Sequence, residues 1–140
     1  MRKPLVLTVA AAALTAGCGL TGTASTEPPA QSGFLRIDGR QESTRSVQCT
    51  QTQWLMTIDA TGNEGQARAF VELGGLQPRV TSVSMQGIEG HHGVADRDTG
   101  DIEVTVNDHN VYTITGTVVG NDGTTPGGSR SMPFEIKAPC

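Results

Sequence analysis

The stretch DIEVTVNDHNVYTITGTVV, residues 101–119, contains the clearest fold signal in this chain. Its apolar residues recur with a two-residue period on both sides of the polar run Asp108-His109-Asn110: Ile102, Val104 and Val106 precede it, and Tyr112, Ile114 and Val118 follow it. Side chains two residues apart share one face of a β-strand. The stretch therefore predicts a β-hairpin with a polar loop.

The same period occurs on both sides of this hairpin. Near the end of the chain the alternating apolar residues predict a half-buried final strand; they are Met132, Phe134, Ile136 and Ala138. Pro133 has no N–H to donate, so this strand should lie at a sheet edge or begin pairing after that residue. Upstream, Val83 and Met85 share one side of residues 79–88. Alternation over residues 67–73 favours a strand over a short helix that ends at Gly74.

Two segments near residue 50 alternate in different phases. Trp54, Met56 and Ile58 share one phase, whereas Val47 and Cys49 share the other. A bulge or a turn near residues 50–53 would reconcile them. Strands of this kind, separated by Gly-rich turns, predict an all-β fold, an antiparallel β-sandwich or half-barrel of about six to eight strands.

Composition excludes two classes of protein. Charged residues make up 17% of the 140 residues, hydrophobic residues 36% and aromatic residues 4%, unlike the Ala-, Glu-, Lys- and Leu-rich mix of a coiled coil. The formal net charge is -4, and Lys and Arg cluster only at Arg2-Lys3. A basic nucleic-acid-binding surface is therefore excluded.

The first residues have the layout of a secretory signal. Positively charged Arg2-Lys3 precede an apolar run over residues 5–16, and small residues then lead to Cys18. Twelve helical residues rise about 18 Å, too little to cross a bilayer core of ~30 Å. The end of the run, Leu14-Thr15-Ala16-Gly17-Cys18, resembles a bacterial lipobox, in which the Cys becomes the first residue and carries lipids. The alternative is an ordinary secretory signal with an incidental Cys.

These features divide the chain into three parts. Residues 1–17 are expected to form a lipoprotein signal peptide, residues 18–33 a lipidated, flexible Thr- and Pro-rich tether, and residues 34–140 a β-rich globular domain. Several acyl chains on Cys18 would anchor the protein stably. We therefore expect it on the extracytoplasmic face of the cell membrane, held there by N-terminal acyl chains.

The three cysteines fit this organisation. Lipidation of Cys18 leaves Cys49 and Cys140 as a pair, and a disulfide persists outside the cytoplasm. The chain-entropy model gives ~4–5 kcal/mol for a loop of about 90 residues. The alternative is two free thiols.

Several short motifs match a known family in order along the chain: Ile37-Asp38-Gly39, Val47-Gln48-Cys49-Thr50, Tyr112-Thr113-Ile114-Thr115-Gly116-Thr117, Phe134-Glu135-Ile136 and Cys140. With its signal and tether, the chain resembles the mycobacterial 19 kDa lipoprotein antigen family. The resemblance implies a lipid-anchored cell-envelope protein, often glycosylated on its tether, whose acylated N-terminus is recognised by host innate receptors. That recognition maps to Cys18, and the family provides no catalytic residues to carry over.

Candidate metal ligands gather between residues 91 and 101. His91-His92 adjoin Asp96, Asp98 and Asp101, and imidazoles and carboxylates bind zinc and other divalent ions. Adjacent histidines on a strand point to opposite faces, so we favour a polar hairpin loop here. Residues 96–101 resemble a calcium loop only faintly, because Gly100 occupies a ligand position and no Glu stands at the twelfth place. A turn hinged at Gly100 is the preferred interpretation.

Three functional hypotheses follow. The preferred one is a non-catalytic, lipid-anchored surface or interaction protein without metal or cofactor, because the sequence has no Gly-x-Ser-x-Gly elbow and no phosphate-binding loop. The second is a lipid or glycolipid carrier, with an apolar cavity lined by Trp54, Met56, Phe70, Met85 and Met132. The third is an envelope metal-binding protein or enzyme that uses His91, His92 or His109.

Overall fold

The computed structural model describes residues 33–124 and 126–140, and those residues form strands, turns and loops without a helix. They contain ten strands. The strands are β1 (Phe34–Ile37), β2 (Arg40–Ser43), β3 (Ser46–Thr52), β4 (Leu55–Thr61), β5 (Gln66–Glu72), β6 (Arg79–Ile88), β7 (His91–Asp96), β8 (Glu103–Val106), β9 (Val111–Asn121) and β10 (Arg130–Pro139).

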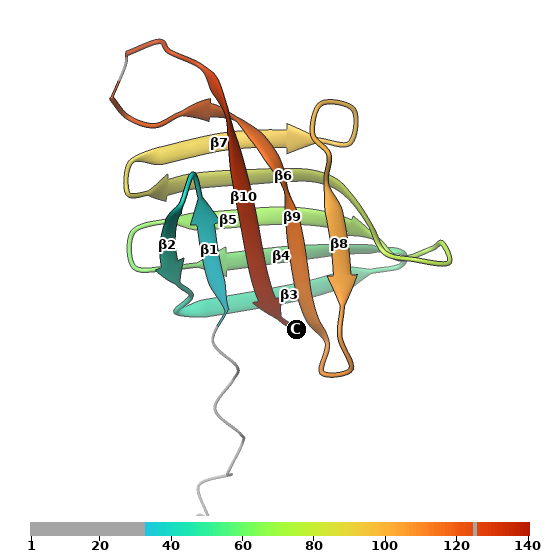
Figure 1. Ribbon diagram of the computed structural model, residues 1–140. Coiled ribbons are helices and arrows are strands. Elements are labelled where there is room, and N and C mark those ends of the chain that lie inside the picture. Colours follow the sequence, from blue (N-terminus) through green and yellow to red (C-terminus); the bar gives the residue numbers. More distant parts are fainter. Residues whose placement is uncertain (1–32, 125) are drawn as a thin grey trace, which may run out of the picture.

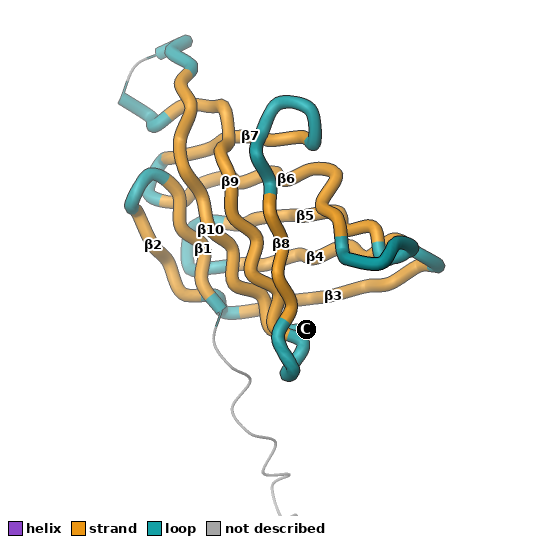
Figure 2. The backbone as a smooth tube through the Cα atoms, turned by 45° about the vertical axis from the view of Figure 1, so that its right-hand side comes forward, coloured by secondary structure: helices purple, strands orange, loops and turns teal. Residues whose placement is uncertain are grey.

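All ten strands belong to one antiparallel sheet that folds over on itself. The order is β2-β1-β10-β9-β7-β6-β5-β4-β3, and β8 pairs with β9 beside this path. Figures 1 and 2 show two layers, with β3 to β7 in one and the strands β1, β2, β8, β9 and β10 running across them in the other. This half-barrel confirms the predicted fold class. The strands number ten rather than about six to eight, partly because short strands such as β2 have no apolar alternation.

The hydrophobic core lies between the two layers. Each layer contributes its inward-facing residues, so alternation along the strands becomes alternation between core and surface. In β10 the four residues Met132, Phe134, Ile136 and Ala138 are all buried, as predicted. The largest fully buried side chains are Leu35, Ile37, Ile58, Met85, Ile88, Ile114, Met132 and Ile136.

The crossing between the layers depends on two glycines. Strand β7 pairs with β9 through His92↔Asn121, Gly93↔Gly120 and Val94↔Val119. A Cβ on Gly120 would lie 1.9 Å from the carbonyl oxygen of His92, and one on Gly93 would lie 2.8 Å from Cγ2 of Val118. Real Cβ atoms do not approach so closely, so the two backbones can come together only because Gly120 lacks a side chain, while Gly93 leaves room for the Val118 side chain.

Strand β10 is central, not an edge strand. It pairs with β9 over its whole length and with β1 from Phe34↔Lys137 to Ile37↔Phe134. The β1 pairing thus begins just after Pro133, the second of the two predicted arrangements. Pro133 directs its carbonyl toward β1, where Asp38 N–H donates to it at 2.8 Å. The ring nitrogen of Pro133 faces the same side as its carbonyl. The missing N–H therefore lies beyond the last residue of β1 and removes no hydrogen bond between β1 and β10.

Two further expectations from the sequence meet different outcomes. Residues 66–72 form strand β5 and not a helix, as preferred. The out-of-phase segments near residue 50 are joined by a turn, in which Gln53 has a φ of 55°. The expected polar loop at His91-His92 is wrong, because these residues begin strand β7.

Candidate functional site

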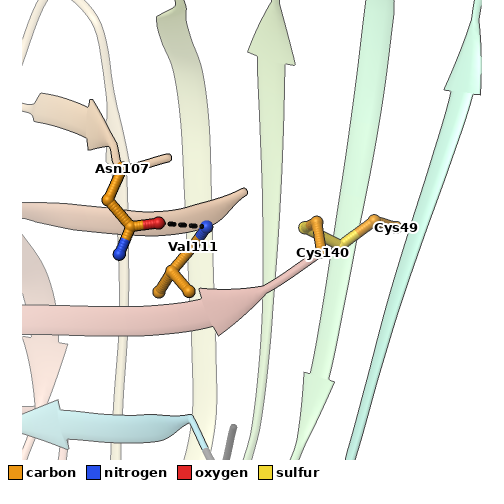
Figure 3. Close-up of a disulfide and its surroundings, with 4 residues drawn as sticks. All are labelled: Cys49, Asn107, Val111 and Cys140. Atoms are coloured by element: carbon orange, nitrogen blue, oxygen red, sulfur yellow. Dashed lines mark hydrogen bonds between the residues drawn. A yellow bond between two sulfur atoms is a disulfide. The ribbon is translucent and has the colours of Figure 1, made fainter. Parts of the chain in front are cut away.

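A disulfide joins the two layers at the open side of the half-barrel. Cys49 of the edge strand β3 is bonded to Cys140, and their Cα atoms are 5.7 Å apart. Cys140 N–H also donates to the carbonyl of Asn110 at 2.9 Å. Figure 3 shows the bridge together with the neighbouring turn, in which Val111 N–H donates to the Asn107 side chain at 3.0 Å. The predicted Cys pairing is therefore present, whereas Cys18 lies outside the described residues.

Of the five residues suggested as an apolar ligand lining, only the three methionines are brought together. Met56, Met85 and Met132 are buried within the core. Trp54 is 70% exposed in the β3–β4 turn. Phe70 lies between the core residues Ala69 and Val71 of β5 and therefore points to the outer face. There it lines a shallow surface depression with Asp59, Arg68 and Ser84.

A charged cluster, formed by Asp38, His91, Asp122 and Arg130, joins three loops at one end of the domain. Arg130 donates to both carboxylate oxygens of Asp38 and, through Nε, to Asp122 at 3.0 Å. His91 is buried, with Nε2 3.5 Å from Oδ2 of Asp38 and Nδ1 3.1 Å from the Glu89 carbonyl. Because its members lie far apart in sequence, no local pattern in the sequence indicated this cluster.

Hydrogen bonds hold both carboxylates of this cluster in the charged form. The bonds from Arg130 lower the pKa of Asp38 below its usual value. The Thr124 hydroxyl, which donates to Asp122 at 2.5 Å, is the main cause that lowers the pKa of Asp122 to about 2. Arg130 in turn has its pKa raised, first by Asp38. One arginine thus binds two carboxylates from different loops, which suits the cluster to clamp three loops together.

The candidate metal ligands are separated by the fold. His91 and His92 are neighbours on β7 and face opposite sides, His91 buried and His92 exposed. His109 lies in the turn between β8 and β9, where Asn107 accepts a hydrogen bond from its N–H at 2.9 Å. Within residues 33–124 and 126–140, no group of three or more His, Cys, Asp or Glu side chains is placed to hold a metal ion.

Residues 96–101 form a turn, the interpretation preferred from the sequence. One oxygen of Asp96 accepts hydrogen bonds from the Asp98 N–H, the Thr99 N–H and the Thr99 hydroxyl. These bonds, that of the hydroxyl first, lower the pKa of Asp96. Gly100 packs closely, since a Cβ there would lie 2.8 Å from the Thr117 carbonyl oxygen. The Asp96 carboxylate is thus engaged by its own turn.

The opposite end of the β3–β6 layer carries an exposed apolar surface, which we call the apolar tip. It consists of Trp54 and Leu55 at the β3–β4 turn and Leu76 in the β5–β6 loop, exposed by 70%, 41% and 106%. The Leu73 N–H donates to the Trp54 carbonyl at 2.7 Å and so joins the two loops. Sequence reasoning placed Trp54 in a cavity and overlooked Leu55 and Leu76.

The carboxylates of the charged cluster are hydrogen-bonded to Arg130 and the candidate metal ligands are dispersed, whereas the apolar tip exposes hydrophobic side chains. The described residues contain no helix that is long and apolar enough to cross a membrane.

Comparison with known proteins agrees with the family resemblance of the sequence motifs. The family model described as Mycobacterium 19 kDa lipoprotein antigen matches residues 20–140. A protein of Mycobacterium avium subsp. hominissuis (strain TH135), named "Putative lipoprotein", is 23% identical over 141 residues, covering 100% of this chain and 97% of that protein. The matched span contains every strand and both cysteines of the disulfide. The chain belongs to the Mycobacterium 19 kDa lipoprotein antigen family.

Proposed function

We propose that this protein is a non-catalytic surface protein of the cell envelope, anchored in the membrane by acyl chains on Cys18. The observation that carries the proposal is membership of a lipoprotein antigen family, with a match that begins two residues after Cys18. The lipobox-like residues Leu14 to Gly17 before that cysteine support it. Two or more acyl chains make such anchoring stable.

The folded domain supports an interaction role over a catalytic one. Its interior is filled by packed apolar side chains, three methionines among them. Its charged cluster pairs Asp38 and Asp122 with one arginine, which leaves the carboxylates as partners in a structural clamp. A stable domain stapled by a disulfide and displayed from a lipid anchor suits a surface antigen.

The anchor is tested by detergent partitioning of the full chain expressed in a mycobacterial host. We expect the wild-type protein in the detergent phase and the Cys18→Ala variant in the aqueous phase or the medium. The matched control, Cys49→Ala with Cys140→Ala, removes two cysteines but leaves Cys18, and should remain with the detergent. Detergent partitioning of Cys18→Ala equal to that of the wild type would refute the proposal.

We further propose that the acylated N-terminus is the part recognised by host innate receptors. A receptor that binds acyl chains gains affinity from buried apolar surface on the lipid and needs no residue of the domain. Purified wild-type protein should therefore activate receptor-bearing reporter cells, and Cys18→Ala should lose that response. An undiminished response to Cys18→Ala would assign the recognition to the folded domain instead.

A further inference from the structure

We infer that the apolar tip is a membrane-contact surface, which places Trp54 and Leu76 in the interfacial layer of a lipid bilayer. The inference rests on the proposed anchor at Cys18, because that anchor would hold the domain beside a membrane. It adds a specific orientation of the domain to the proposed function.

The exposure of the tip is concentrated on two adjacent loops. Trp54, Leu55 and Leu76 are three of the six exposed large hydrophobic residues in the described part of the chain. The other three are valines on the surfaces of β7, β8 and β9. A groove of about 660 Å³ runs beside Trp54 and Leu55 and is lined also by Glu72, Gly74 and Gly75. Large apolar side chains exposed together mark an interaction site.

The tip is electrically neutral in an acidic protein. Residues 51–55 and 72–79 contain only Glu72 and Arg79 as charged residues, and these two lie opposite each other in the β5–β6 pairing. The whole chain has 14 acidic and 10 basic residues. An acidic surface is repelled by anionic lipids, so the neutral tip is a part of the domain that can approach a bilayer without this penalty.

The residue types suit an interface between water and lipid. Tryptophan is enriched at membrane–water boundaries because its indole has an apolar body and a polar N–H. The Trp54 ring lies over Gly74, where an added Cβ would come within 3.5 Å of it. The adjoining leucines offer pure apolar surface. So small a patch would bind weakly alone, but a tether raises its effective concentration at the membrane.

The length of the chain before the domain permits this orientation. The Thr44 N–H donates to the Gly33 carbonyl at 3.0 Å, so residue 33 lies near the start of β3. The apolar tip lies at the other end of β3, seven residues or about 23 Å away. Sixteen residues from Cys18 to Gly33 can span up to about 50 Å. An anchor at Cys18 and the tip can therefore contact the same surface.

Trp54 provides its own probe, because it is the only tryptophan in the chain. The acylated full-length protein is reconstituted in vesicles of phosphatidylcholine and phosphatidylglycerol, with and without phosphatidylcholine brominated high in its acyl chains. We expect bromination to lower Trp54 fluorescence about two-fold, as for an indole in the interfacial layer. Leu76→Asp should reduce this quenching. Val94→Asp, which introduces the same charge at an exposed residue of β7 outside the tip, should not.

Each outcome decides between the anchor and the tip. Protein that floats with the vesicles but shows no quenching retains its anchor and overturns the inference. Protein that fails to float, yet is quenched when excess vesicles are added, overturns the anchor and supports the tip. Absence of both flotation and quenching refutes both. Equal loss of quenching in Leu76→Asp and Val94→Asp would also overturn the inference.

Discussion

Cys49 and Cys140, separated by 91 positions in sequence, are bonded to each other across the open side of the half-barrel. On the other side the layers are continuous through the β7–β9 pairing. The disulfide therefore fastens β3, an edge strand of one layer, to the end of β10 in the other. Figure 1 shows the C-terminus beside β3, as this bond requires.

Removal of the bridge should destabilise the domain strongly. In the chain-entropy model a loop of this length contributes ~4–5 kcal/mol, so Cys49→Ser with Cys140→Ser should lower the free energy of unfolding by about that amount. Urea titration followed by circular dichroism measures the change. Chemical reduction of the wild type should reproduce it, and an unchanged midpoint in both samples would contradict the structural role of the bond.

The crossing of the layers should not tolerate a methyl group at Gly120. Gly120→Ala pushes a Cβ into the His92 carbonyl, and we expect a loss of about 3 kcal/mol or more, or failure to fold. Gly75→Ala is the matched control, because its nearest contact would be an ordinary 3.6 Å. Equal melting temperatures for the two variants would show that the backbones do not approach as described.

Truncation of a core methionine should cost far more stability than truncation of the tryptophan at the apolar tip. Met132→Ala empties a fully buried site and should cost about 2–5 kcal/mol. Trp54→Ala removes a side chain that is 70% exposed and should change stability by less than about 1 kcal/mol. Thermal unfolding followed by circular dichroism separates the two cases. A large loss for Trp54→Ala would instead place its ring in the core.

Acid should weaken the charged cluster. The folded-state pKa values of Asp38 and Asp122 lie below the usual 3.8, that of Asp122 at about 2. Groups with a depressed pKa stabilise the fold above their unfolded pKa and lose that contribution as pH falls through the folded value. The melting temperature should therefore fall between about pH 4 and pH 2. The fall should be smaller in Asp122→Asn, and an identical fall in both proteins would remove Asp122 from the account.

Most strands of the fold were predictable from the two-residue period of the apolar residues and from its phase. The alternation of Met132, Phe134, Ile136 and Ala138 predicted β10 because each of these residues faces the core. The same rule contained an unused signal at Phe70, which is out of phase with the buried Ala69 and Val71. Trp54 was misplaced because it continues the phase of Met56 backward past the start of β4, into the β3–β4 turn.

The charged cluster and the apolar tip were not predictable in this way. Asp38 and Arg130 are 92 positions apart, and only the pairing of β1 with β10 brings their loops together. Leu76 has no periodic neighbour in its loop, so nothing local indicated that it would lie fully exposed in a loop adjacent to that of Trp54. His91 was assigned to a loop because a pair of histidines gives no strand signal.

The central claim, an acyl anchor at Cys18, is tested most directly by mass spectrometry of the N-terminus of protein purified from mycobacterial membranes. The account predicts a mature chain that starts at Cys18 and carries the mass of diacylglycerol and an amide-linked acyl chain. A mature N-terminus at another residue, or an unmodified Cys18, would contradict it.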